Sequence, residues 1–159
     1  MAQDHPRYPE LAERFLTYYE DALCVRTALF EGVERLLGAL DAAGFPWGIV
    51  TNKRQRFTAP LIDALGLTRR SGCVVSGDSA PRPKPHPEPL WFASRLLGAT
   101  PERCIYVGDD LRDVRAARSA GMTAVAAAYG YLGSAEPIEL WGADRIIAAP
   151  EELLDWVSP

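Results

Sequence analysis

The stretch CIYVGDDLRDVRAA, residues 104–117, decides the fold class, because an apolar run passes directly into acidic residues and then into a helical pattern. The run CIYVG at 104–108 is apolar at consecutive positions, which predicts a strand covered on both faces. Leu111, Val114 and Ala117 then recur at helical spacing, and the pattern stops at Gly121. A buried strand followed at once by a helix is typical of α/β proteins.

The same alternation of helix, glycine and apolar strand recurs along the chain. Helical stripes stop at Gly44, Gly66 and Gly98, and each is followed by an apolar run. The predicted strands are 47–51, 73–77, 104–108, 123–128 and 145–148, with a closing helix at 150–157. We therefore expect an α/β fold with a Rossmann-like parallel sheet and helices on both faces. In such sheets the site lies at the carboxyl ends of the strands.

Composition limits the class of protein. The chain has 159 residues, 48% of them hydrophobic, which suits one domain, and no stretch is long and apolar enough to cross a membrane. A net charge of -4 argues against a nucleic-acid-binding surface. Cys24, Cys73 and Cys104 are odd in number and lack metal-type spacing, and two of them begin apolar runs, so we expect buried reduced thiols and a cytoplasmic protein.

Polar side chains follow three of the predicted strands. Thr51 and Asn52 end the first strand, Lys84 lies among four prolines after the second, and three aspartates follow the third at 109, 110 and 113. A hydroxyl, an ammonium group and carboxylates at one sheet edge suit a phosphate held beside a divalent metal. The plainer interpretations stay open: turn chemistry for Thr51 and a solvated lysine for Lys84. His86 is interpreted as a loop residue, because no second ligand accompanies it at metal spacing.

The three aspartates divide between capping and metal binding. Asp110 can cap the helix that begins at Leu111, and Asp113 lies one turn in, where acids favour the helix dipole. Capping does not need Asp109, which comes directly after the strand. Magnesium prefers one or two carboxylates with water and substrate oxygens, so Asp109 is the predicted Mg²⁺ ligand and Asp113 a second or supporting one.

Three ordered stretches resemble a known family. GIVTNKRQRFT, RPKPHPEPL and YVGDDLRDVRAARSAGM resemble motifs two, three and four of the haloacid dehalogenase superfamily, in its phosphoglycolate phosphatase-like branch. YGY at 129–131 and WGAD at 141–144 are similar to the bacterial N-acetylmuramic acid 6-phosphate phosphatases. The similarity runs from about residue 8 to the end.

The resemblance implies a Mg²⁺-dependent phosphatase acting on a small phosphorylated metabolite, such as phosphoglycolate or N-acetylmuramic acid 6-phosphate. It implies that Thr51 binds the transferring phosphoryl group, assisted by Asn52, and that Lys84 stabilises phosphate and nucleophile. Asp109 would hold Mg²⁺, and Asp113 would support both the metal and the lysine. In the family an aspartate attacks phosphorus and water releases the aspartyl-phosphate.

The family's first motif, D-x-D-G at the end of an opening strand, has no counterpart here. None of the ten aspartates lies two positions from another. We expect a truncated phosphatase that is inactive as given, with residues 1–28 as the remnant of a helical cap and 29–159 as a core lacking its first strand. The alternative is a non-catalytic phosphate-ligand-binding or regulatory protein of the same fold.

Two structural expectations follow from the missing strand. The strands at 47–51 and 104–108 must pair with each other, admit a strand from another chain, or keep unpaired edges, so a homodimer through exposed edges is possible. Residues 9–23 resemble the last cap helix, and we expect the aromatic residues of its apolar face to pack in a core. A receiver domain is disfavoured because Thr51 and Lys84 precede the acids, and a dinucleotide-binding fold because no G-x-G-x-x-G follows any strand.

Overall fold

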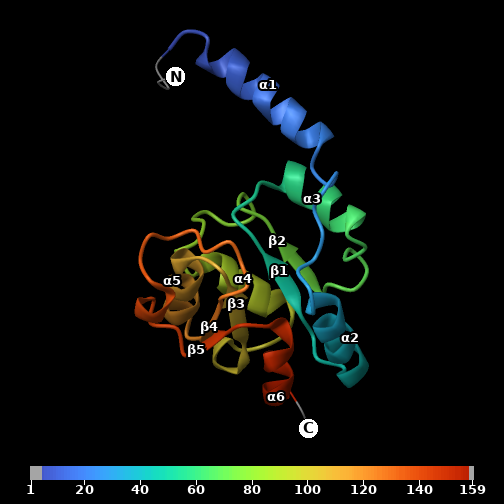
Figure 1. The fold of residues 1–159 in the computed structure, drawn as a ribbon, viewed down its shortest axis with the longest axis vertical. Coiled ribbons are helices and arrows are strands. Elements are labelled where there is room, and N and C mark those ends of the chain that lie inside the picture. The colour runs from blue at the N-terminus through green and yellow to red at the C-terminus, as the bar shows by residue number, and fades with distance from the viewer. Residues whose placement is uncertain (1–4, 158–159) are drawn as a thin grey trace.

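The computed structural model describes residues 5–157 and has the predicted α/β alternation (Figure 1). The strands lie within two residues of the predicted bounds. The helices are α1 Tyr8–Asp21, α2 Val33–Ala43, α3 Gln55–Ala64, α4 Glu88–Leu96, α5 Leu111–Ala120 and α6 Leu154–Val157. The strands are β1 Gly48–Val50, β2 Cys73–Val75, β3 Ile105–Gly108, β4 Thr123–Ala127 and β5 Arg145–Ile147. The closing segment begins as a 3-10 turn, Pro150–Leu153, before α6.

Glycines end the helices as the pattern predicts. Gly44 follows α2 with φ of 72°, and Gly121 follows α5 with φ of 79°. This left-handed backbone lets the glycine N–H bond to carbonyls of the last turn, a conformation that costs other residues energy. The chain then turns directly into the next strand.

Strand β4 is covered on both faces, which explains its unbroken apolar sequence. Ala124 and Ala126 face a core cluster formed with α4 and α5, whereas Val125 faces a second cluster with α2, β5 and the Pro150–Leu153 turn. Successive strand residues point to opposite faces, so both faces must be apolar when helices cover both. The predicted Rossmann-like arrangement is confirmed.

The strands form two separate sheets instead of one. β1 pairs in parallel with β2, and β3, β4 and β5 form a second parallel sheet in that order. β1 and β3 do not pair with each other. Every residue of these two strands is at least partly exposed, whereas β4 is buried from Ala124 to Ala127. Of the outcomes expected for a missing central strand, direct pairing of β1 with β3 does not occur within the described residues.

The hydrogen bonds between paired strands show which backbone groups face the gap between the two sheets. Thr51 N–H donates to Val75 and Trp47 accepts from Gly72, so the residues between, Gly48 and Val50, turn their N–H and C=O away from β2. Cys104 likewise accepts from Thr123, which turns Ile105 and Val107 away from β4.

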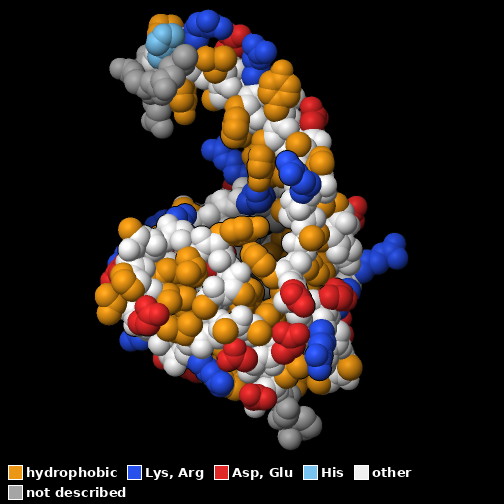
Figure 2. Space-filling model, viewed as in Figure 1, with side chains coloured by type: hydrophobic (Ala, Val, Ile, Leu, Met, Phe, Trp, Pro, Cys, Tyr) orange, Lys and Arg blue, Asp and Glu red, His pale blue; other side chains and the backbone are white. Residues whose placement is uncertain are grey.

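The expectation that the aromatic face of the first helix packs in a core is wrong. α1 extends away from the body above α3, and none of its residues is buried (Figure 1). Phe15 and Tyr18 are each 66% exposed, and hydrophobic side chains lie along this arm (Figure 2). A few contacts hold α1 to α3: Tyr19 packs edge-on against Phe57, with ring centroids 5.4 Å apart, and Arg56 forms ion pairs with Glu13 and Glu20. The helix is amphipathic, but the described residues offer its apolar face no core.

Two expectations from composition can be compared with the described residues. All three cysteines are free thiols, as predicted, but only Cys73 is buried, whereas Cys24 and Cys104 are partly exposed. None of the helices described within residues 5–157 is both long and apolar enough to span a bilayer.

Candidate active site

Lys84 is the centre of the polar edge at the carboxyl ends of β1 and β3. Its side chain is 9% exposed, and Nζ donates to the Val50 carbonyl at 3.0 Å and to the Tyr106 hydroxyl at 2.8 Å. Nζ also lies 2.7 Å from Asp113 Oδ1. That approach lacks hydrogen-bond geometry, since this oxygen has no hydrogen-bond partner, so we treat the contact as an ion pair. A buried ammonium group needs such partners to remain charged.

Asn52 fixes the backbone of this lysine. Its Nδ2 donates to the Lys84 carbonyl at 2.9 Å, and its Oδ1 accepts from the Lys84 N–H at 3.0 Å. Both halves of the amide are therefore used across 32 residues of sequence. The resemblance implied that Asn52 assists in binding the phosphoryl group. In the structure its amide aligns the lysine loop with the end of β1.

Thr51 keeps a free donor at the end of β1. Its Oγ1 accepts a hydrogen bond from the Lys53 N–H at 3.1 Å, and its own N–H donates to Val75. Because a hydroxyl carries one donor and two acceptor sites, the O–H remains able to donate. The turn chemistry that was the plainer interpretation is therefore present, and it leaves the hydroxyl hydrogen available.

Asp109 is held by the loop that follows β4. Its Oδ2 accepts from the Tyr131 N–H at 2.8 Å. A Cβ at Gly130 would lie 2.2 Å from Asp109 Cβ, so only glycine allows this close approach. Oδ1 of Asp109 has no hydrogen bond to the described part of the chain, which leaves one carboxylate oxygen for a ligand.

Asp110 and Asp113 form a capping box at the start of α5, as the spacing predicted. Asp110 Oδ1 accepts from the Arg112 N–H at 2.9 Å, and Asp113 Oδ2 accepts from the Asp110 N–H at 3.3 Å. Burial acts to raise the pKa of Asp110, but the hydrogen bonds and charge of Arg112 outweigh it and hold that pKa below its usual value. Asp113 thus joins the helix start to Lys84.

Tyr106 belongs to this site and was missed by sequence reasoning. Its hydroxyl accepts from Lys84 and donates to the Val50 carbonyl at 3.1 Å, across the gap between the two sheets. Burial, and then the charges of Asp113 and Asp109, raise the pKa of the hydroxyl well above its usual value, so it stays neutral. The only sequence signal was an aromatic hydroxyl inside an otherwise apolar strand.

The donor set fits magnesium better than a metal bound by protein alone. Residues 5–157 contain no group of three or more His, Cys, Asp or Glu side chains able to hold an ion. Magnesium usually takes one or two carboxylates and completes its shell with water and phosphate oxygens. Asp109 meets that description, whereas both oxygens of Asp113 already have partners.

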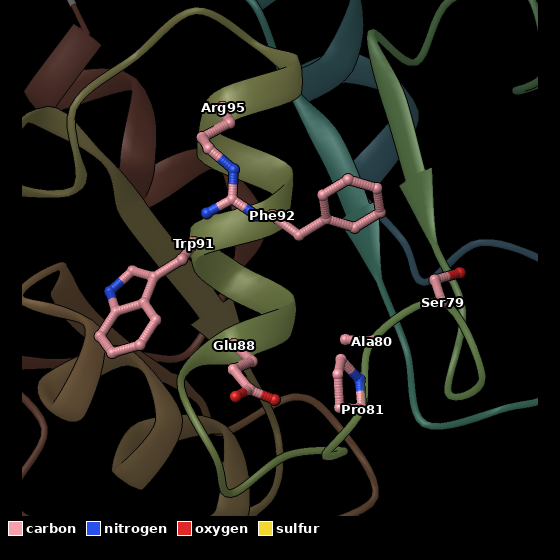
Figure 3. A pocket seen from close by; sticks show the side chains of 7 residues that line it. All are labelled: Ser79, Ala80, Pro81, Glu88, Trp91, Phe92 and Arg95. Atoms are coloured by element: carbon pink, nitrogen blue, oxygen red, sulfur yellow. The ribbon is translucent and has the colours of Figure 1, made fainter.

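A surface depression lies away from this edge. It has a volume of about 370 Å³ between α4 and the loop after β2, with Trp91, Phe92 and Arg95 on the helix side and Ser79 to Pro81 opposite (Figure 3). None of the predicted site residues lines it.

The comparisons with known proteins agree with the sequence motifs. A family model described as haloacid dehalogenase-like hydrolase matches residues 2–127. The chain is 40% identical over 155 residues to the N-acetylmuramic acid 6-phosphate phosphatase of Pseudomonas aeruginosa, covering 98% of this chain and 69% of that protein. It is 39% identical to the phosphoglycolate phosphatase of Escherichia coli, covering 91% of this chain and 57% of that one.

A solved structure shares the whole described arrangement. A predicted phosphoglycolate phosphatase from Haemophilus somnus superposes with a TM-score of 0.89 at 30% identity, covering 99% of this chain and 69% of that one. A putative phosphoglycolate phosphatase from Lactobacillus delbrueckii gives 0.84 at 26% identity, with coverage of 95% and 62%. This chain therefore spans between 57% and 69% of the length of these four proteins.

Proposed function

Because the chain belongs to the haloacid dehalogenase-like hydrolase family, we propose that its strand-edge cluster is the phosphate- and Mg²⁺-binding part of a phosphomonoester hydrolase site. The cluster comprises Thr51, Asn52, Lys84, Asp109 and Asp113. The observation that carries the proposal is the nearly buried Lys84 ammonium group, fixed between Asp113, Tyr106 and the Val50 carbonyl at the carboxyl ends of the strands.

Lys84 and Thr51 would bind the phosphate oxygens. Two of the three N–H donors of Lys84 Nζ already bond to the Val50 carbonyl and the Tyr106 hydroxyl, which leaves one N–H for a phosphate oxygen. Asp113 would stay beside the ammonium group, because the attraction between the opposite charges orients the lysine. The free Thr51 hydroxyl would donate to a second oxygen.

Mg²⁺ would be held by Asp109, with Asp113 supporting the metal and the lysine. When bound, the ion would neutralise charge on the phosphoryl group and orient it. The fixed orientation of Asp109, with Oδ2 on the Tyr131 N–H, supports its role as the ligand that offers Oδ1. In most magnesium sites the protein provides only one or two ligands.

Hydrolysis through an aspartyl-phosphate needs a further carboxylate, which would attack phosphorus and displace the alcohol of the ester; water would then release inorganic phosphate and regenerate the carboxylate. The 159 residues contain no D-x-D pair, and the site aspartates are occupied by capping, the lysine or the proposed metal. We therefore propose that this chain binds its ligand without turning it over. The whole enzyme would use the residues described here together with a nucleophile.

The division of the chain is part of the same proposal. Residues 1–28 would be the remnant of a helical cap, and 29–159 the phosphatase core without one strand. The unburied α1 and the gap between β1 and β3 support this division. The exposed edges would also allow a homodimer to form.

The names of the relatives support two leaving groups, glycolate and N-acetylmuramic acid. Both give a small phosphorylated metabolite as ligand. A second candidate function remains, that of a binding or regulatory protein that never hydrolyses phosphate esters, and the missing D-x-D pair favours it.

One pair of measurements distinguishes the two functions. Calorimetry of the 159-residue chain with inorganic phosphate and Mg²⁺ tests binding, and release of phosphate from phosphoglycolate and from N-acetylmuramic acid 6-phosphate tests turnover. We expect binding without turnover, and turnover once a D-x-D-G segment of a relative is fused ahead of the chain. Binding that persists with no turnover in the fusion would favour the regulatory function, and absence of binding in folded protein would exclude both.

A further inference from the structure

Three aromatic rings from distant parts of the sequence meet beside Asp109. Phe30 lies edge-on to Tyr129, with ring centroids 5.7 Å apart, and 5.2 Å from the ring of Tyr131. We call Phe30, Tyr129 and Tyr131 the aromatic shelf. The phosphate and metal chemistry proposed above uses none of these rings.

Tyr129 and Phe30 connect the aromatic shelf to the body of the fold. Tyr129 is partly buried and packs against the core cluster that contains Val125 and Ile147. Phe30 lies just before Gly32, which begins α2 and is in close contact with the side chain of Glu151. Tyr129 therefore packs on the core, and Phe30 lies at the start of α2, where its carbonyl accepts from the Val33 N–H.

The backbone of Tyr131 is fixed by the acidic cluster itself. Its N–H donates to Asp109 Oδ2 at 2.8 Å. Gly130 passes against Asp109, and Gly133 passes so close to Asp110 that an added Cβ would lie 2.4 Å from Oδ2. The loop from 130 to 133 is thereby seated on both aspartates, and the place of the Tyr131 ring is tied to the proposed metal ligand.

Tyr131 is nevertheless 86% exposed. A large ring on a fixed backbone, adjoining a polar site and covered by nothing in the described chain, contributes little to folding stability. Rings in this position are suited to bind the apolar face of a ligand whose polar end lies in the neighbouring site.

We propose that the aromatic shelf receives the ring of a phosphorylated sugar whose phosphate lies at Lys84 and Thr51. The inference rests on the proposed function and narrows its ligand to a ring-bearing ester. A glycolate leaving group has no ring face to stack on these aromatic side chains. Burial raises the pKa of the Tyr129 hydroxyl, and the charges of Asp109 and Glu151 raise it further.

The test compares two ligands on three proteins by calorimetry in Mg²⁺. N-acetylglucosamine 6-phosphate is the ring-bearing probe, and inorganic phosphate reports the phosphate site alone. Tyr131→Ala removes the exposed ring but keeps the backbone N–H that holds Asp109. Tyr18→Ala is the matched control, because Tyr18 is also exposed but lies on α1.

We expect Tyr131→Ala to weaken binding of the sugar phosphate roughly threefold to tenfold, the range for one lost aromatic contact, with the phosphate affinity unchanged. Tyr18→Ala should change neither affinity. Equal weakening for both ligands would show that Tyr131 only supports Asp109 and would overturn the inference, as would no change for either. If wild-type protein binds phosphate but binds the sugar phosphate no more tightly, the shelf proposal fails alone. If it binds neither, the proposed function fails with it.

Discussion

The Lys84 side chain connects the ends of β1 and β3 through hydrogen bonds to the Val50 carbonyl and the Tyr106 hydroxyl, and Asn52 fixes the backbone of this lysine. Its amide pairs with both backbone polar groups of Lys84, so the lysine loop is aligned before any ligand binds. The sequence could predict both residues, because each follows an apolar strand. It could not predict the pairing, because 32 residues separate them.

The first prediction concerns this alignment. Asn52→Ala removes both hydrogen bonds and leaves the Lys84 backbone groups without partners, so it should lower the free energy of unfolding by about 1–3 kcal/mol and weaken phosphate binding. Asn52→Asp keeps the acceptor for the Lys84 N–H and should lose less. Urea unfolding and phosphate calorimetry measure the two effects. Unchanged phosphate affinity in a folded Asn52→Ala protein would separate Asn52 from the site.

The second prediction concerns Gly130. A methyl group there would overlap Asp109, so Gly130→Ala should displace the proposed metal ligand and weaken Mg²⁺ binding. Gly38→Ala is the control, because Gly38 lies within α2 with no heavy atom within 4 Å of its added Cβ. That control should raise stability by roughly 0.5–1 kcal/mol. Mg²⁺ titration calorimetry and thermal melts compare them, and equal Mg²⁺ affinity in both variants would argue against Asp109 as ligand.

Among the elements, α5 was the most fully predicted and α1 the least. Asp110, Asp113 and Gly121 give α5 a start and an end that local chemistry sets, and the structure has both. The amphipathic pattern of α1 correctly predicts a helix but says nothing about what covers it. Sequence periodicity identifies an apolar face; only the rest of the fold provides its partner.

The third prediction uses the cap of α5. Asp110→Ala should cost about 1 kcal/mol of folding stability, within the range for lost N-caps. Because the pKa of Asp110 is lowered in the folded protein, its contribution is complete above its usual value near 3.8 and is lost as pH falls through the lower folded value. Asp110→Asn keeps the cap but does not titrate. Denaturant unfolding between pH 2 and pH 6 should therefore show a smaller acid loss for Asp110→Asn than for wild type, and parallel curves would contradict the assignment.

For the whole molecule, the main finding is the divided sheet. The order of elements and the covering of both sheet faces could be predicted, because the apolar runs indicate buried strands and the glycines indicate where helices end. Whether β1 and β3 would close on each other could not, since the pattern of each strand is the same with or without a neighbour. The Tyr106 hydroxyl and the Lys84 ammonium group both bond to the Val50 carbonyl in this gap.

The fourth prediction follows from these edges. The chain should associate as its concentration rises, as measured by sedimentation equilibrium, because the backbone groups of β1 and β3 that face the gap have no ladder partner within residues 5–157. Ile105→Pro removes an N–H that faces the gap and should reduce association. Ile146→Pro is the control: both isoleucines are 37% exposed, and Ile146 turns its N–H outward on the far edge, at β5. A wild-type chain that stays monomeric and melts cooperatively would show that these strand edges do not drive association.

The most direct test of the central claim is the effect of Mg²⁺ on phosphate affinity in wild type and in Asp109→Asn, with exposed Asp155→Asn as control. If Asp109 holds the ion beside the phosphate bound by Lys84 and Thr51, Mg²⁺ should tighten phosphate binding about tenfold in wild type and the control. In Asp109→Asn the gain should fall to about twofold or less. An undiminished Mg²⁺ effect in Asp109→Asn would place the metal elsewhere and refute the proposed site.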